Sequence, residues 1–353
     1  MKNKQISFNV PNSDLIRLLC VTIFIFVWMT LMRPALFLRP ANFLSMGYQL
    51  PELGLYSLAM MMVMVTGGRD LSIVGIGNLA AIMAAYILHP ALVNGLGGTP
   101  LVMVILAAVL AALLIGAACG IVNGIIVAYM GIPAMLATMA TSSIFTGIGI
   151  VITRGEAFSK VPPEFLYFGG NTFLKIPIPL WLLIIALAAS AYLLNMTKFG
   201  FEVKMVGSNR MASHYSGINT EMVLIKAYVF SGIMCALCGL EIVARTDAAK
   251  ADYAYTYTFQ AILAAVLGAT NPNGGFAKIS CIILSLLSLQ FLSSGFNMLR
   301  LGSWFKEFTW GLLLILVLSM DVFIVYYRKQ KSIKAVIKSR AAGEEAPAGQ
   351  SAG

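Results

Sequence analysis

Few residues of this sequence could carry out acid–base, nucleophilic or metal chemistry. Only 11% of the 353 residues are charged, and nearly every acid, Glu52 among them, falls at or beyond the end of an apolar run. Glu241 alone lies inside such a run, with Arg245 one helical turn further on as an i,i+4 partner. The histidines, His89 and His214, are far apart. No catalytic triad, paired carboxylate or metal-ligand cluster is visible, so we expect no catalytic residue, metal site or cofactor.

The composition indicates that lipid surrounds most of the chain. Apolar and aromatic residues make up 59% of it, and the mean hydropathy is +0.87, whereas soluble domains are about 45–50% apolar and about 25% charged. This balance excludes a soluble globular chain and a disordered one. The five cysteines all fall in apolar runs, which favours helix packing over disulfides or a zinc site.

The apolar runs predict an all-α, polytopic membrane protein with about ten transmembrane helices. A helix needs about 20 apolar residues to cross the bilayer. Two of the runs are short, and each leads straight into a Gly-rich turn. The predicted spans cover residues 15–32, 52–66, 71–88, 101–129, 133–153, 178–195, 223–245, 255–269, 279–298 and 305–327.

The basic residues predict that both termini lie in the cytoplasm. With ten spans and an internal N-terminus, fifteen of the 24 Lys and Arg fall on the inside and nine on the outside. We therefore read the formal charge of +10 as an orientation signal and not as a nucleic-acid footprint. The expected organisation is a cytoplasmic N-terminus (1–14), a transmembrane domain (15–327) with a cytoplasmic loop (197–222), and a basic, then disordered, cytoplasmic tail (328–353).

The chain lacks the means to power transport by itself. It has no phosphate loop of the form GxxxxGK followed by Ser or Thr, so it should not hydrolyse nucleotides. An ion-driven secondary transporter or a membrane enzyme usually carries ionisable groups at membrane depth, and the sequence pattern places almost none there. Uphill transport would then draw its energy from another subunit.

The longest predicted cytoplasmic loop contains a short helix that a partner could grip. Ser208 is a favourable N-cap and Gly217 a favourable C′ residue for it. Met211 and Tyr215 share one face of this helix, with Arg210 and His214 beside them. A capped amphipathic helix outside the membrane suits the groove of a partner protein, and the alternative is a helix lying on the lipid headgroups.

Glycines and one carboxylate predict a capped turn and a close helix–helix contact. Gly67 and Gly68 allow a tight turn, after which Asp70 should accept the amide of Ser72 or the following residue and so cap the third span. A ladder of small residues at positions 116, 120 and 124 predicts close helix packing.

Three blocks of the sequence resemble a known family. They are residues 66–72 (TGGRDLS), residues 206–209 (VGSN) with 216–219 (SGIN), and residues 264–270 (AAVLGAT) followed by Gly274 and Gly275. In these blocks the chain resembles the membrane permease subunits of ribose-, xylose- and galactose-type ABC importers, a family shared with branched-chain amino acid permeases. The resemblance covers roughly residues 40–325. Arg69 and the stretch 255–260 depart from the family pattern.

The resemblance implies a non-catalytic permease subunit in the bacterial plasma (inner) membrane. Its expected partners are ATP-binding subunits, a periplasmic or lipid-anchored solute-binding protein, a second permease copy or paralogue, and membrane lipid, with no nucleic acid. The implied solute is a pentose or hexose; a nucleoside, inositol or a furanosyl signalling molecule are the alternatives. Spans 2–5 and 7–10 would form inverted repeats.

The resemblance also assigns roles to residues. Coupling to the ATPase falls on the loop residues Gly207, Ser208, Asn209, Arg210, Met211, His214, Tyr215 and Gly217. A path for uncharged sugars needs hydroxyl, amide and aromatic partners and little charge, because strong binding inside the membrane would slow release. The candidates within or near the spans are Asn78, Asn123, Thr138, Thr141, Phe259, Gln260, Ser293, Ser294 and Asn297.

Overall fold

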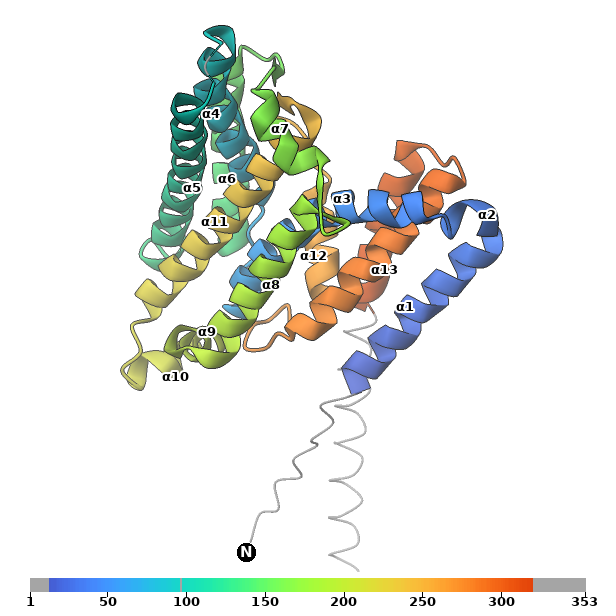
Figure 1. Ribbon diagram of the computed structural model, residues 1–353. Coiled ribbons are helices and arrows are strands. Elements are labelled where there is room, and N and C mark those ends of the chain that lie inside the picture. Colours follow the sequence, from blue (N-terminus) through green and yellow to red (C-terminus); the bar gives the residue numbers. More distant parts are fainter. Residues whose placement is uncertain (1–12, 96, 320–353) are drawn as a thin grey trace, which may run out of the picture.

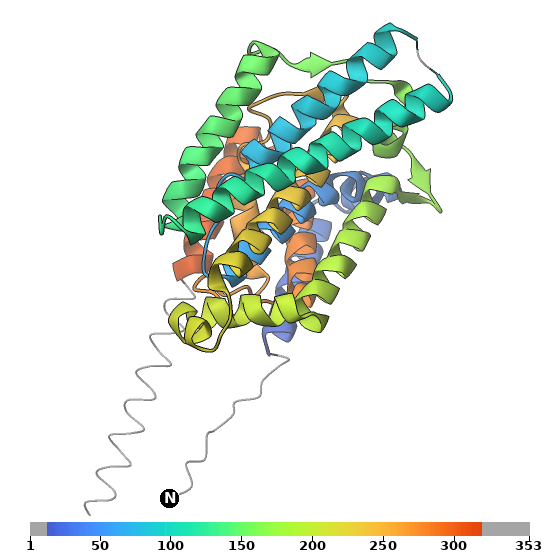
Figure 2. The ribbon, with the colours of Figure 1, turned by 90° about the vertical axis from the view of Figure 1, so that its left-hand side faces the viewer.

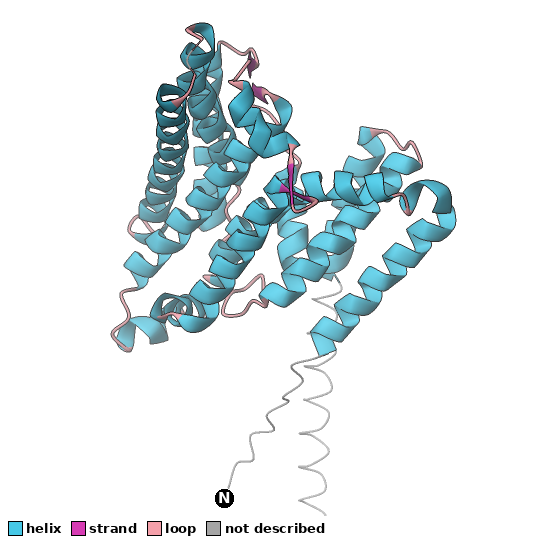
Figure 3. Cartoon of the chain, viewed as in Figure 1, coloured by secondary structure: helices cyan, strands magenta, loops and turns pink. Residues whose placement is uncertain are grey.

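The chain folds as a bundle of helices, seen here in a computed structural model that describes residues 13–95 and 97–319 (Figures 1 and 3). A further helix covers residues 303–319 at the end of the described part. The predicted all-α class is confirmed. The longer helices are α1 (Ser13–Met32), α3 (Pro40–Val65), α4 (Ile73–Val93), α5 (Thr99–Ala128), α6 (Ala134–Thr153), α8 (Ile178–Met196), α11 (Thr220–Thr246), α12 (Tyr257–Leu267) and α13 (Ile279–Met298).

Short elements connect these helices. Two antiparallel pairs of two-residue strands brace the loops: β1 (Phe158–Ser159) with β4 (Ala248–Ala249), and β2 (Thr172–Phe173) with β3 (Ile176–Pro177). The short helices are α2 (Pro34–Phe37), α7 (Pro163–Gly170), α9 (Lys198–Ser208) and α10 (Arg210–Tyr215). Figure 1 places α9 and α10 at the end of the bundle where α1 begins.

Seven of the described helices are long and apolar enough to cross a membrane: α1, α4, α5, α6, α8, α11 and α13. Each coincides with a predicted span. The count of about ten, the orientation and the inverted repeats stay predictions. The tenth predicted span, 305–327, is helical over residues 305–319, and the rest of it, like the termini 1–12 and 320–353, lies outside the described residues.

The second predicted span is wrong in its start. Helix α3 begins at Pro40 and runs for 26 residues through an internal proline, Pro51. Proline suits the first helical turn, where its missing N–H is not needed, and an internal proline is tolerated where neighbouring helices satisfy the freed carbonyl. Glu52 therefore lies in the middle of a helix, and every residue from Pro51 to Val65 is buried. The prediction that Glu52 sits at a span end is corrected.

The eighth predicted span is a short helix. Helix α12 has only 11 residues, from Tyr257 to Leu267, and a series of turns over residues 251–256 precedes it. It packs against α3 and α13. The segment that the eighth span was expected to cover is therefore helical over only part of its length.

Helix α11 packs very closely on α5, and glycine makes this contact possible. A methyl group on Gly116 would overlap the carbonyl oxygen of Gly232 and lie 2.7 Å from Cβ of Ala236. A methyl group on Gly124 would lie 2.7 Å from Cα of Ile225. The prediction of close packing from this glycine ladder is confirmed, and Figure 2 shows α5 in front of α11.

Replacement of one ladder glycine should loosen this contact. We expect Gly116→Ala to lower the free energy of unfolding by about 1–3 kcal/mol, because the added methyl meets backbone that cannot move aside cheaply. Gly147→Ala in α6 is the matched control, since its methyl would enter open space. Thermal unfolding of the purified protein measures the stability of both variants. Equal midpoints for the two variants would contradict the packing argument.

Candidate functional site

The three sequence blocks meet at one point through their backbones. The amide of Gly275, in the turn between α12 and α13, donates a 2.8 Å hydrogen bond to the carbonyl of Val65 at the end of α3. A methyl group on Gly207, near the end of α9, would overlap that same carbonyl and lie 2.6 Å from the Gly275 nitrogen. A methyl group on Gly274 would lie 2.8 Å from the Gly67 nitrogen. We call Gly67, Gly207, Gly274 and Gly275 the glycine junction.

Both turns of the glycine junction need glycine for their conformation as well as for space. Gly67, Gly274 and Gly275 have φ of +87°, +95° and +83°, a region that side chains with a Cβ rarely adopt. The sequence pattern singled out these residues but did not indicate that they touch. A direct backbone contact therefore links the end of α9 to both α3 and the α12–α13 turn.

Asp70 is the centre of a buried polar network beside this junction. Its carboxylate accepts the amide of Ser72 at 3.0 Å, the hydroxyl of Ser72 at 2.6 Å and the hydroxyl of Ser231 at 2.9 Å. Asn123 donates to the Ser72 hydroxyl at 2.7 Å. All four residues are buried. The predicted bond to the Ser72 amide is confirmed, and the network also joins the start of α4 to α5 and α11.

Burial and hydrogen bonding act on Asp70 in opposite directions. Burial raises the pKa of the Asp70 carboxyl, and the hydrogen bonds from Ser72 and Ser231 oppose that change. No described cation pairs with this carboxylate within 4.0 Å. Neutral donors alone hold the turn in place, which fits a structural role.

Several path candidates are engaged in holding helices and turns together. Thr138 accepts the amide of Leu71 at 3.0 Å and so fixes the turn before α4 against α6. Asn78 donates to the carbonyls of residues 251 and 253 at 3.0 and 2.9 Å. Thr141 is buried and bonds to the carbonyl of Thr138. These side chains, like Asn123, have partners inside the protein.

The other path candidates lie on α12 and α13. Phe259 in the first turn of α12 is 49% exposed, and Gln260 beside it is half-buried. On α13, Ser293 is half-buried, Ser294 donates to Asn42 at 2.7 Å, and Asn297 is exposed and contacts Lys306. None of the nine candidates lines either of the two pockets found at the corners of α8 and α7.

The loop helix has a different N-cap from the predicted one. Ser208 is the last residue of α9, and Asn209 instead caps α10 by accepting the amide of Ala212 at 3.0 Å. Asn209 is extended, with φ −161° and ψ 104°, and so separates two consecutive helices. The sequence pattern missed α9, which has its own cap where Thr197 accepts the Gly200 amide at 3.2 Å.

The end of α10 forms as predicted. Gly217 has φ +80°, its amide donates to the carbonyl of His214, and the next amide donates to the carbonyl of Ser213. This is the double hydrogen bond of a Schellman cap. Gly217 is thus confirmed as the C′ residue.

Helix α10 presents an exposed apolar face. Met211 is 64% exposed and Tyr215 is 82% exposed, and His214 is exposed beside them. Arg210, in contrast, donates to the carbonyl of Ala128 at the end of α5 at 3.1 Å and lies 3.6 Å from Glu221 of α11. The apolar pair is free to meet a partner, whereas Arg210 ties α10 to two long helices.

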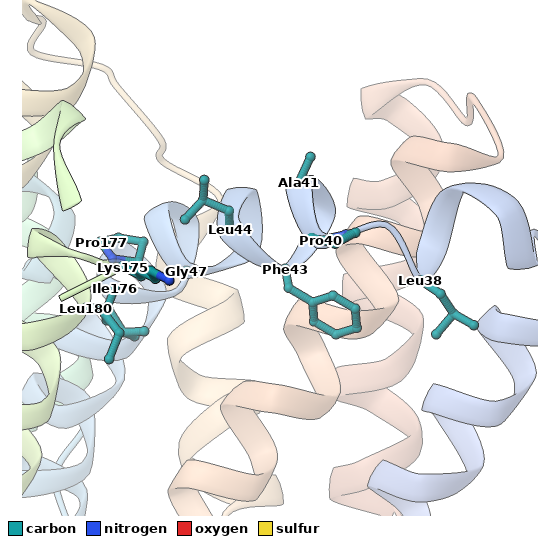
Figure 4. A pocket seen from close by; sticks show the side chains of 10 residues that line it. All are labelled: Leu38, Pro40, Ala41, Phe43, Leu44, Gly47, Lys175, Ile176, Pro177 and Leu180. Atoms are coloured by element: carbon teal, nitrogen blue, oxygen red, sulfur yellow. The ribbon is translucent and has the colours of Figure 1, made fainter. Parts of the chain in front are cut away.

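A broad apolar hollow of about 710 Å³ lies at the far end of α8 from α9. The α2–α3 corner supplies Leu38, Phe43 and Leu44, and the β3–α8 corner supplies Lys175 and Leu180 (Figure 4). None of the residues singled out from the sequence lines it. Lys175 is the one charged residue that lines the hollow, so the lining does not form a catalytic site.

Sequence reasoning missed a buried ionic cluster. The carboxylate of Glu52 contacts the guanidinium of Arg245 and accepts a 2.7 Å hydrogen bond from Tyr257. The sequence contained one indication of this cluster, since Tyr257 belongs to the stretch that departs from the family pattern. The prediction failed because it did not include the full length of α3, which places Glu52 in the interior.

Comparison with known proteins agrees with these motifs. Residues 42–318 match the family described as branched-chain amino acid transport system / permease component. The chain is 32% identical over 269 residues to the ribose import permease protein of Escherichia coli (strain K12), covering 75% of this chain and 80% of that protein.

Two other relatives carry different names. The autoinducer 2 import system permease protein LsrC of Escherichia coli (strain K12 / DH10B) is 30% identical over 267 residues, covering 76% of this chain and 75% of that protein. The L-arabinose ABC transporter permease protein of Azospirillum brasilense is 25% identical over 290 residues, 81% of each. No solved structure matches the chain. The chain is a multi-pass protein of the bacterial inner membrane, and it belongs to the family of branched-chain amino acid transport system permease components.

Proposed function

We propose that this chain is the permease subunit of an ABC importer for a sugar, with a pentose as the first expectation. The observation that carries the proposal is the glycine junction, where the family-like blocks meet in backbone contact. Relatives named for ribose, L-arabinose and autoinducer 2 support this solute class. A nucleoside, inositol or a furanosyl signalling molecule is the alternative cargo for the same architecture.

The permease family to which the chain belongs implies further subunits. ATP-binding subunits would bind at α9 and α10, and a periplasmic or lipid-anchored binding protein would deliver the solute at the opposite face. A second permease copy or paralogue would complete the path. ATP hydrolysis belongs to the partners, and this subunit performs no catalysis.

Coupling would pass through the glycine junction. The exposed pair Met211 and Tyr215 of α10 would enter the ATPase surface, and α9 would move with it. Because Gly207 touches Val65 and Gly275 without an intervening side chain, its displacement acts directly on α3 and on the α12–α13 turn. Packed protein is nearly incompressible, so these central helices would rock and change the side to which the path opens.

The path itself would be only weakly polar. Phe259, Gln260 and Ser293 keep partly exposed side chains that can meet hydroxyl groups and sugar C–H faces. The better-bonded candidates, such as Asn78 and Thr138, would position helices around it. Low affinity along the path agrees with release on the cytoplasmic side.

Reconstitution with the cognate ATPase and binding protein tests the function. We expect uptake of labelled ribose or L-arabinose into proteoliposomes only with active ATPase, because the sequence contains no phosphate loop with which to hydrolyse ATP. An ATPase made catalytically inactive should reduce uptake to background, and competition by unlabelled sugars, nucleosides and inositol should rank the solutes. Uptake that persists with the inactive ATPase and follows an ion gradient instead would overturn the importer proposal.

Two sets of variants separate docking from transmission in the same assay. Met211→Ala with Tyr215→Ala should weaken ATPase binding and lower ATP hydrolysis and uptake together. Gly207→Ala leaves the docking face intact but adds a methyl group at the junction. We expect it to raise the ATP consumed per solute roughly tenfold, within the usual range of coupling energies.

Tyr192→Ala, an exposed position on α8, is the matched control and should change neither quantity. Thermal unfolding of each variant verifies that it is folded. A folded Gly207→Ala variant with normal coupling would show that the junction does not transmit the movement.

A further inference from the structure

A buried ionic cluster joins three central helices at the end of α11 away from α10. Glu52 comes from α3, Glu241 and Arg245 from α11, and Tyr257 from α12. Glu52 is 1% exposed and Glu241 is 4% exposed. These four residues, which we call the outer cluster, contain two carboxyl groups and one guanidinium.

The two carboxyl groups have unequal partners. Glu52 contacts the Nη2 of Arg245 through Oε1 and accepts the Tyr257 hydroxyl through Oε2. Among the described residues, neither carboxyl oxygen of Glu241 has a hydrogen-bond donor. Its nearest cation is the Nε of Arg245, at 3.7 Å. One guanidinium is therefore shared by two carboxyl groups: it hydrogen-bonds Glu52 and only faces Glu241, at an ion-pair distance and without a hydrogen bond.

No other described cation lies within 4.0 Å of Glu241; beyond the end of α11, Lys250 pairs with Asp252, and Asp247 accepts the amide of Val161. The remaining ionisable groups around the cluster are uncharged at neutral pH: Tyr56 of α3, Cys238 of α11, Tyr253 in the turn before α12, and Tyr257. Helix α5 carries no acidic or basic residue, His89 of α4 contacts the carbonyl of Lys160, and Glu164 of α7 is exposed. The ion pairs of the described residues give neither carboxylate a second cation.

Glu241 has a simple way to lose its charge. A buried carboxylate without donors is far more costly than the neutral acid, and such a group takes up a proton instead. We propose that Glu241 is a proton-binding site and that the outer cluster in its stable form holds one proton on this carboxyl group. Arg245 lies in the last turn of α11 and its side chain is 25% exposed, which links the cluster to the protein surface and gives the proton a route by which to exchange.

The proton has a mechanical consequence. Its loss leaves two carboxylates on one guanidinium, and their repulsion acts between α3 and α11. Helix α3 also ends at the glycine junction, and α12, which Tyr257 ties to Glu52, leads into it. Alkaline pH should therefore loosen the packing of α3 against α11, and α3 is one of the elements on which the proposed coupling movement acts.

Infrared pH-difference spectroscopy of the full-length permease in lipid nanodiscs tests the proposal without partner or solute. We expect the wild type to show the carbonyl band of a protonated buried carboxyl group, shifting in heavy water and vanishing as the pH rises. Glu241→Gln should lose this band and, unlike the wild type, keep its thermal midpoint at alkaline pH. Glu164→Gln, an exposed acid on α7, is the matched control and should keep both wild-type behaviours.

A second variant, Glu52→Gln, tests the proposal independently in case Glu241→Gln does not fold. Glu52→Gln leaves one carboxylate for one guanidinium, so Glu241 should ionise, and the band should disappear or move to lower pH. A wild-type spectrum without a band that depends on Glu241 would overturn the proposal, as would a band unchanged in Glu52→Gln. Either result leaves the importer function untouched, because the measurement involves no transport.

Discussion

Backbone-to-backbone contact is the interaction on which the central part of this structure depends. Helix α11 lies so close to α5 that a Cβ at Gly116 would enter a carbonyl of the opposite helix. The ends of α3, α9 and the α12–α13 turn meet in the same way at the glycine junction. Such contacts transmit displacement without the slack of long side chains, and in lipid, where no hydrophobic force draws helices together, close packing of this kind supplies much of the attraction.

Polar groups in the bundle follow a second constraint, the absence of water from the hydrocarbon layer. A polar group there is costly unless it finds a partner inside the protein. Asp70 does so with two serines, and Glu52 does so with Arg245 and Tyr257. These networks join segments that are far apart in the chain, so the polar residues fix which helices are neighbours while the glycines fix how near they come.

Hydropathy predicted the helices well because a membrane span needs a long apolar run. Seven spans, the turn at Asp70 and the end of α10 at Gly217 followed from local chemistry. Hydropathy failed at α3, whose first half carries polar residues and whose internal proline reads as a boundary. That one error displaced Glu52 from the interior to an edge and hid the outer cluster.

The convergence of the glycines could not be predicted for a different reason. Spacing along the chain shows where a turn occurs, but not which turns touch, and nothing local distinguishes Gly207 in contact with Val65 from a solvated loop glycine. The path candidates illustrate the same limit. Asn78 and Thr138 have residue types suited to solute, yet tertiary contacts engage them in holding the turn at 251–253 and the start of α4.

The two caps of α10 have a consequence for recognition by a partner. Asn209 satisfies the amide at one end and Gly217 directs the closing hydrogen bonds at the other, so this helix of 6 residues holds its shape with bonds drawn from its own segment. Arg210 anchors it to α5 and α11. A protein that binds Met211 and Tyr215 thus meets a rigid, preorganised surface and loses little conformational entropy on binding, so even a small contact area can be gripped firmly.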